Sequence, residues 1–167
     1  MDTFLAIASR RDERSYAQRA LPEQVVTRIL DAGRLAGSAR NRQPWRFLVA
    51  ADRDALAELV YAPANVRSAA LAVVVAVTGG GPIEFDAGRA VQNMLLAAWN
   101  EGVISCPNGM PEPDRVKKLL ALEPEERPVV ALSFGYPRRP RDPERRAAAD
   151  WSARANRRSL DELVRRV

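Results

Sequence analysis

The stretch Ser38–Ala50, SARNRQPWRFLVA, sets a polar, turn-prone cluster directly against an apolar run. The apolar part, Trp45–Ala51, is rich in aromatic and aliphatic residues and predicts a strand. Asn41, Gln43 and Pro44 suit neither a strand nor a core. Their side chains fit an Asx-type turn that leads into the strand, and they also fit a loop that hydrogen-bonds a ligand. The residues alone leave both interpretations open.

The segments around this stretch predict strands separated by helices. A continuous valine-rich run, Ala69–Val77, predicts a strand buried on both faces. Residues 85–102 predict a helix that is apolar on most sides, and we assign Asp86 as its cap and Asn93 to the core. Shorter patterns predict helices over 21–37, 52–61 and 112–122 and a third strand over 127–137. Strands that alternate with helices indicate a layered α/β arrangement.

The composition limits the chemistry. The chain has 167 residues, which suits a single domain over 1–167, and it contains no histidine. The lack of histidine excludes Ser-His-Asp and Cys-His catalysis and most zinc sites. We therefore expect no metal site. If the protein is an enzyme, we expect an organic cofactor to perform the difficult chemistry.

The single cysteine and the lengths of the apolar runs indicate the cellular compartment of the protein. The single cysteine, Cys106, excludes an internal disulfide and suits a reducing cytoplasm. The longest apolar run, 69–77, is about half of the ~20 residues that a membrane span needs. The apolar stretch near the N-terminus is too short for a signal peptide. We expect a cytoplasmic protein with no membrane partner.

Arginine supplies nearly all of the positive charge. Of 26 basic residues only Lys117 and Lys118 are lysine, and the net charge is +5. The whole excess lies in residues 138–167, which begin within a Pro/Arg-rich connector, and a second arginine cluster lies near the N-terminus. Either cluster could hold a phosphate, coat a nucleic acid or form a solvated surface. Trp151 is the one aromatic residue among the tail arginines, so we expect no nucleic-acid partner.

Five segments resemble, in the same order, motifs of the FMN-dependent nitroreductase family. The segment AGSARNRQPWRFLV, 36–49, is the most specific match. The others are RRDER at 10–14, FDAGRAVQNMLLAAWNEGVISC at 85–106, ERPVVALSFGYP at 126–137 and NRRSLDELV at 156–164. The resemblance implies a three-layer α+β fold with a central, mostly antiparallel sheet flanked by helices. It also implies an intertwined homodimer, in which the basic extension 138–167 docks on the partner subunit.

The resemblance further implies a function. In the family, NADH or NADPH reduces an FMN at the subunit interface and leaves. A nitroaromatic, a quinone or a similar small acceptor then takes its place and is reduced, so no protein residue is named as catalytic. Two alternatives stay open. One is other flavin chemistry on the same fold, such as cofactor biosynthesis, dehalogenation or deazaflavin-linked reduction, and the other is a non-enzymatic binding protein with a degenerate flavin site.

The resemblance assigns the FMN phosphate to arginines from both ends of the chain. A dianion in a partly buried site needs several positive donors, because an unpaired buried charge is costly. The expected donors are Arg10, Arg11, Arg14, Arg157 and Arg158. Asp12 stands where the family usually has serine, and its carboxylate would repel a phosphate unless it pairs with a neighbouring arginine.

Three segments are expected to meet the flavin ring. Their residues are Ser38, Asn41, Gln43, Asn65, Arg67, Pro107, Asn108 and Gly109. The first three would hydrogen-bond the ring that is bound mainly by the partner subunit. The last three lie in the expected loop Cys106–Met110, whose backbone N–H groups would face flavin N5 and O4. Asn65 and Arg67 would contact flavin N1 and O2.

Two further departures from the family pattern concern the pocket. Gly37 stands where the family usually has proline, which loosens the loop that follows it. No insertion between Pro111 and Tyr136 could serve as a lid. We therefore expect an open pocket and a broad range of substrates.

Overall fold

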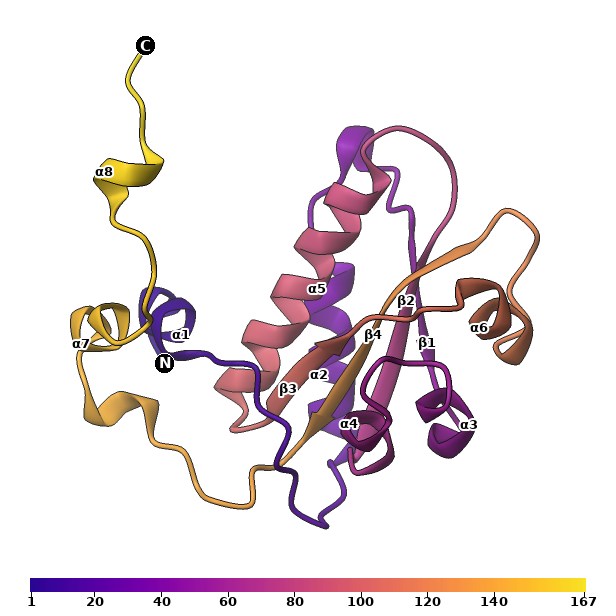
Figure 1. Cartoon of the computed structure of the whole chain (residues 1–167), viewed down its shortest axis with the longest axis horizontal. Helices are drawn as coiled ribbons and strands as arrows, with labels where there is room; N and C mark the ends of the chain where they lie inside the picture. The colour runs from indigo at the N-terminus through magenta and orange to yellow at the C-terminus, as the bar shows by residue number, and fades with distance from the viewer. The chain divides into compact units, whose positions relative to one another are not determined.

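The sheet is antiparallel throughout and lies in the larger of two compact units. The computed structural model describes residues 1–167, which divide into a core unit, residues 11–140, and a terminal unit, residues 1–10 and 141–167. The core unit holds four strands in the order β1-β2-β4-β3 (Figure 1). They are β1 (Trp45–Val49), β2 (Leu71–Val77), β3 (Ile104–Asn108) and β4 (Arg127–Gly135). The predicted mostly antiparallel sheet is confirmed.

Strand β2 is the centre of the core, because every one of its residues is buried. Its alternate side chains face opposite sides of the sheet. On one side, Val73 and Val75 join an apolar cluster with α2 (Glu23–Arg34) and α5 (Ile83–Asn100). Trp45 and Phe47 are half-buried and pack against this cluster.

The other side of the sheet carries the short helices. Ala72 and Val74 join a second apolar cluster that includes Leu56, Val66 and Val116. These three residues belong to α3 (Arg53–Ala57), α4 (Pro63–Arg67) and α6 (Pro113–Leu119). Figure 1 shows α2 and α5 on one side of the sheet and α3, α4 and α6 on the other. The three layers predicted for this fold are confirmed in the core unit.

The expected loop Cys106–Met110 begins inside a strand, so this prediction needs correction. Residues 104–108 form β3, which pairs with β4 from Ile104 opposite Gly135 to Asn108 opposite Ala131. An edge strand tolerates Pro107, which has no backbone N–H. Residues 11–14, the N-terminal arm, cover the free edge of β3, because Asp12 forms a parallel bridge with Ser105.

Helix α5 begins earlier than expected. It starts at Ile83, so the prediction that Asp86 caps it is wrong. Asp86 lies in the first turn and is buried, and its carboxylate accepts a hydrogen bond from the Ala39 N–H at 3.0 Å. The prediction of a core position for Asn93 is also wrong, because Asn93 is exposed and donates to the Ala32 carbonyl at 3.2 Å. Both side chains tie α5 to α2 and to the segment that follows α2.

The terminal unit is built from four short helical segments. They are α1 (Thr3–Ser9), η2 (Pro143–Arg145), α7 (Ala148–Ala153) and α8 (Leu160–Leu163). Helix α1 packs against α7, and Trp151 Nε1 donates to the Pro143 carbonyl at 2.8 Å. Ser159 and Glu162 form a capping box at the start of α8. No helix of the chain combines the length and the apolar surface needed to cross a bilayer.

Candidate functional site

The loop that leads into β1 is held in an unusual backbone conformation. Arg40, Asn41 and Gln43 have φ values of 53°, 55° and 49°, a region that few residues other than glycine adopt. Ser38 Oγ accepts a hydrogen bond from the Gln43 N–H at 2.8 Å, and Gln43 Nε2 donates to Asn41 Oδ1 at 3.2 Å. The structure therefore brings the three predicted ring contacts of this segment together. Asn41 and Gln43 remain exposed to solvent.

The first turn of α5 braces this loop from behind. Asp86 accepts from the Ala39 N–H, and Arg89 lies 3.8 Å from the Asp86 carboxylate. The guanidinium of Arg89 fills the space beside Gly37, where a Cβ would come within 2.4 Å of it. This guanidinium is the end of a flexible, half-exposed side chain that could shift to admit a Cβ, so the structure does not explain the missing proline.

The arm that carries two of the predicted phosphate ligands runs along β3. The Glu13 N–H donates to the Ser105 carbonyl at 3.1 Å, and Arg14 Nε lies 3.2 Å from Cys106 Sγ. Arg11 and Arg14 therefore belong to the core unit. The remaining three predicted phosphate ligands, Arg10, Arg157 and Arg158, belong to the terminal unit. Within that unit Arg158 lies 3.7 Å from the Glu162 carboxylate.

A buried hydrogen bond joins two predicted ring contacts from different elements. Asn65, on α4, donates through Nδ2 to Asn108 Oδ1 at 2.9 Å, and both side chains are buried. Asn108 Nδ2 in turn donates to the Cys106 carbonyl at 2.8 Å and to Ser133 Oγ at 3.1 Å. These bonds fix the orientation of the Asn108 amide, and through it the side chain of Asn65.

Two residues that sequence reasoning missed complete this network. The Ser133 hydroxyl donates to the Cys106 carbonyl at 3.1 Å, so the Tyr16 hydroxyl is the donor in its 2.8 Å bond to Ser133 Oγ. Tyr16 is only 1% exposed, and burial raises the pKa of its phenol. Tyr16 and Ser133 are 117 residues apart in the sequence, so no local sequence pattern indicates that their side chains meet.

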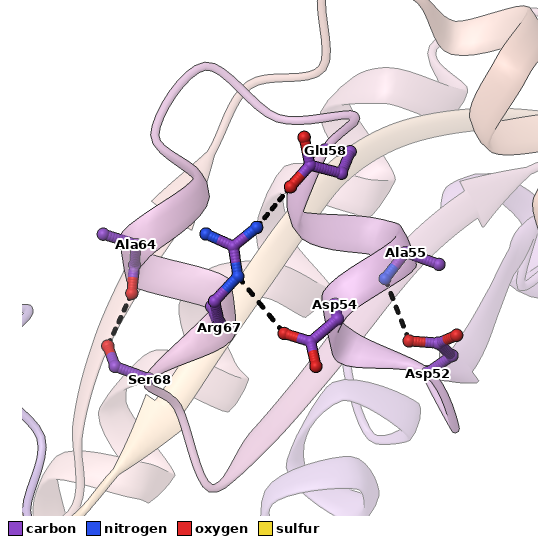
Figure 2. Close-up of polar contacts among 7 residues, drawn as sticks. All are labelled: Asp52, Asp54, Ala55, Glu58, Ala64, Arg67 and Ser68. Atoms are coloured by element: carbon purple, nitrogen blue, oxygen red, sulfur yellow. Dashed lines mark hydrogen bonds and ion pairs between the residues drawn. The ribbon is translucent and has the colours of Figure 1, made fainter.

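Arg67 forms ion pairs with the segment that precedes α4. Figure 2 shows its guanidinium between two carboxylates of the preceding segment, Asp54, at 3.2 Å from Nε, and Glu58. All three side chains are largely exposed. The structure thus gives Arg67 a role in joining α4 to the α3 region, and its expected contact with flavin N1 and O2 stays a prediction.

The end of β3 presents a backbone donor next to an aromatic ring. Gly109 accepts from the Tyr61 N–H at 3.0 Å, while its own N–H has no hydrogen-bond partner within the chain. A Cβ at Gly109 would lie 2.9 Å from Tyr61 Cδ2, so glycine is what allows the ring to lie against this backbone. An unpartnered N–H at this position fits a ligand that offers an acceptor atom, as flavin N5 and O4 do.

The two sets of predicted ring contacts belong to opposite edges of the sheet. The segment with Ser38 leads into β1, and Asn108 and Gly109 lie at the end of β3, which are the two outer strands of the order β1-β2-β4-β3. Asn65 bonds to Asn108 and therefore belongs with the β3 edge. Figure 1 shows β2 and β4 between these two strands. Three strand spacings separate the two edges by about 14 Å.

The comparison with protein families identifies the class of protein. The sequence model of the nitroreductase family matches residues 7–79 and 83–136. This match covers most of the chain and includes the Ser38–Gln43 loop, α4 and β3. The chain belongs to the nitroreductase family.

Particular relatives agree with this assignment. A protein of Methanothermobacter thermautotrophicus, named "Putative NADH dehydrogenase/NAD(P)H nitroreductase", is 32% identical over 149 residues, which cover 82% of this chain and 78% of that protein. A protein of Archaeoglobus fulgidus with the same name is 34% identical over 149 residues, which cover 81% of this chain and 86% of that protein.

Solved structures share the fold over nearly the whole chain. A crystal structure from Desulfovibrio desulfuricans, described as a "putative nitroreductase in complex with fmn", has a TM-score of 0.80 at 31% identity and covers 98% of this chain and 96% of that chain. The nitroreductase family protein of Streptococcus pneumoniae TIGR4 has a TM-score of 0.83 at 19% identity and covers 99% of this chain and all of that chain. The second comparison is evidence of the fold alone.

Proposed function

We propose that this protein is an FMN-dependent oxidoreductase that takes electrons from NADH or NADPH and passes them to a nitroaromatic, a quinone or a similar small acceptor. Family membership supports this function, as do the names of the two relatives and the FMN-bound neighbour. The observation that carries the proposal is the buried Asn65–Asn108 pair beside the unpartnered N–H of Gly109. The resemblance assigns the ring to these groups.

Bound FMN would supply the redox chemistry, because its ring accepts a hydride from NAD(P)H and returns two electrons with protons to an acceptor. The chain would supply positioning. The Gly109 N–H would donate to N5 or O4, which stabilises negative charge on the ring without any reorganisation. Asn65, whose Nδ2 is already committed to Asn108, would present its remaining amide hydrogen and its Oδ1 to the pyrimidine edge.

The proposed active form is a homodimer with two shared sites. Each ring would meet Asn65 and Gly109 of one chain and Asn41 and Gln43 of the other, because these two sets belong to opposite edges of one sheet. The exposed α8 supports the same arrangement. Leu160 and Leu163 are 76% and 58% exposed, and a helix of this length is not stable without packing.

The phosphate would be held by the arginines of the N-terminal arm and of the C-terminal segment. We expect Arg14→Ala to weaken FMN binding by about 1.5–3 kcal/mol, the usual range for a charge-assisted hydrogen bond. A matched control is Arg115→Ala, which removes a surface arginine paired with Glu112 on α6. Equal retention of flavin by the parent, Arg14→Ala and Arg115→Ala proteins after dialysis would count against the phosphate assignment.

The test of the function is anaerobic reduction. The protein, reconstituted with excess FMN and freed of unbound flavin, should show an absorption band near about 450 nm that NADH or NADPH bleaches and that menadione restores. A protein that retains no flavin would support the alternative of a degenerate binding protein. A flavin that binds but is not reduced by either nicotinamide would favour another flavin chemistry on the same fold.

A further inference from the structure

Tyr61 combines an exposed ring with a fixed backbone. It lies between α3 and α4, and the residue is 76% exposed, more than any other aromatic residue of the chain. Its N–H nevertheless donates to the Gly109 carbonyl at 3.0 Å, and its ring lies against the Gly109 backbone. The backbone of Tyr61 is therefore held at the end of β3, and its exposed ring lies beside Gly109.

Neither core packing nor hydrogen bonding explains why an aromatic ring stands at this position. Tyr16 shows what a structural tyrosine does here, because it is buried and its hydroxyl bonds to Ser133. The Tyr61 hydroxyl makes no hydrogen bond within the chain, and the ring belongs to neither apolar cluster. The segment after β3 folds into α6, which packs on β4 and leaves Tyr61 exposed.

We propose that Tyr61 is a specificity-determining residue, whose ring forms an apolar wall of the acceptor pocket and favours planar aromatic acceptors such as quinones over acceptors with no aromatic face. This inference rests on the proposed function, because it takes Gly109 as the backbone donor beside the reacting edge of the flavin. An acceptor must approach that edge to be reduced. A ring fixed against Gly109 is then within reach of the acceptor, and aromatic pairs stack in offset or edge-to-face arrangements.

The discriminating experiment measures reoxidation of the reduced, FMN-loaded protein without NAD(P)H. The flavin is photoreduced anaerobically and mixed with menadione or ferricyanide in a stopped-flow instrument. Menadione takes two electrons and two protons per reduced flavin to give the hydroquinone. Ferricyanide takes one electron per ion, so two ions oxidise one flavin, and it offers no aromatic face. The ratio of the two second-order rate constants measures the preference for an aromatic acceptor.

We expect Tyr61→Leu to lower the menadione rate constant roughly 3- to 10-fold, the loss expected for one aromatic contact, and to leave the ferricyanide rate constant unchanged. Tyr61→Phe keeps the ring and removes the hydroxyl, so both of its rate constants should match those of the parent. The flavin content and melting temperature of both variants should also match, because Tyr61 packs in neither core cluster.

Each other outcome overturns the inference in a recognisable way. Equal menadione rates in the parent and Tyr61→Leu would remove Tyr61 from the acceptor pocket while the proposed function stands. An equal loss with both acceptors would assign Tyr61 to flavin binding, and a weakened dimer with an unchanged rate ratio would assign it to the subunit contact. A parent protein that binds no FMN would overturn the proposed function itself and this inference with it.

Discussion

At the residue scale, the buried polar network shows where sequence reasoning succeeded and where it stopped. Asn65 and Asn108 were named through the family resemblance, and the structure joins them by a hydrogen bond of 2.9 Å. Tyr16 and Ser133 were not named, although they hold Asn108 in place. A side chain selected by contacts across the sheet carries no local signature, because neither its neighbours nor its spacing differ from those of an ordinary core residue.

The Tyr16 phenol predicts a pH dependence of stability. Burial raises its folded-state pKa above the ordinary value of 10.0, so above about pH 10 the unfolded chain releases this proton before the folded protein does. The free energy of unfolding of the parent should therefore be unaffected by this group below pH 10 and should fall as the pH rises further.

Comparison with Tyr16→Phe isolates that effect. The variant lacks the phenol hydrogen bonds, so it should be less stable than the parent by about 1 kcal/mol at neutral pH. The difference should shrink above about pH 10, because the variant lacks the titrating group. Urea unfolding between about pH 8 and 11 measures both curves, and curves that stay parallel over this range would contradict the argument.

At the element scale, strands and helices with a strong apolar pattern were predicted well. A strand that forms only through pairing with distant segments was not. The valine-rich run predicted β2 within two residues of its start, because burial on both faces leaves a continuous apolar signal. Residues 104–108, ISCPN, have no such signal and form β3 only because β4 and the N-terminal arm pair with them. The short helices α1 and α4 were not predicted, whereas α3 and α6, of the same lengths, were.

The close approach of α2 and α5 gives a prediction with a matched control. A Cβ at Gly33 would lie 2.8 Å from both Met94 Cγ and Phe47 Cζ, whereas a Cβ at Gly88 of α5 would meet no atom within 4 Å. We expect Gly33→Ala to destabilise the protein by about 1–3 kcal/mol through overpacking, despite the higher helix propensity of alanine.

Gly88→Ala tests the propensity effect without the clash. This variant should be up to about 1 kcal/mol more stable than the parent. Chemical denaturation of both variants under the same conditions provides the comparison. A Gly33→Ala protein as stable as the Gly88→Ala protein would show that α2 and α5 are not packed as closely as described.

At the scale of the whole molecule, the proposed site extends beyond a single chain. The resemblance predicted a dimer, and the core unit supplies a physical reason for it, because the Asn41 loop leads into one edge strand, β1, and Asn65 bonds to Asn108 of the other edge strand, β3. The local sequence pattern does not encode which surfaces of two copies meet. The assignment of Arg10, Arg157 and Arg158 to the same phosphate as Arg14 therefore stays a prediction, as does docking of the extension 138–167 on a partner.

The most direct measurement of the shared site uses two complementary defective chains. One chain carries Asn41→Ala and Gln43→Ala, and the other carries Arg14→Gln; each alone should form dimers that lose FMN on dialysis. A mixed dimer can be made by co-expression and purified through two different affinity tags. One of its two sites would combine the intact loop of the second chain with the intact N-terminal arm of the first. The account predicts about half of the parent's flavin per mixed dimer. A mixed dimer as empty as its two parents, or a monomer that retains flavin, would contradict it.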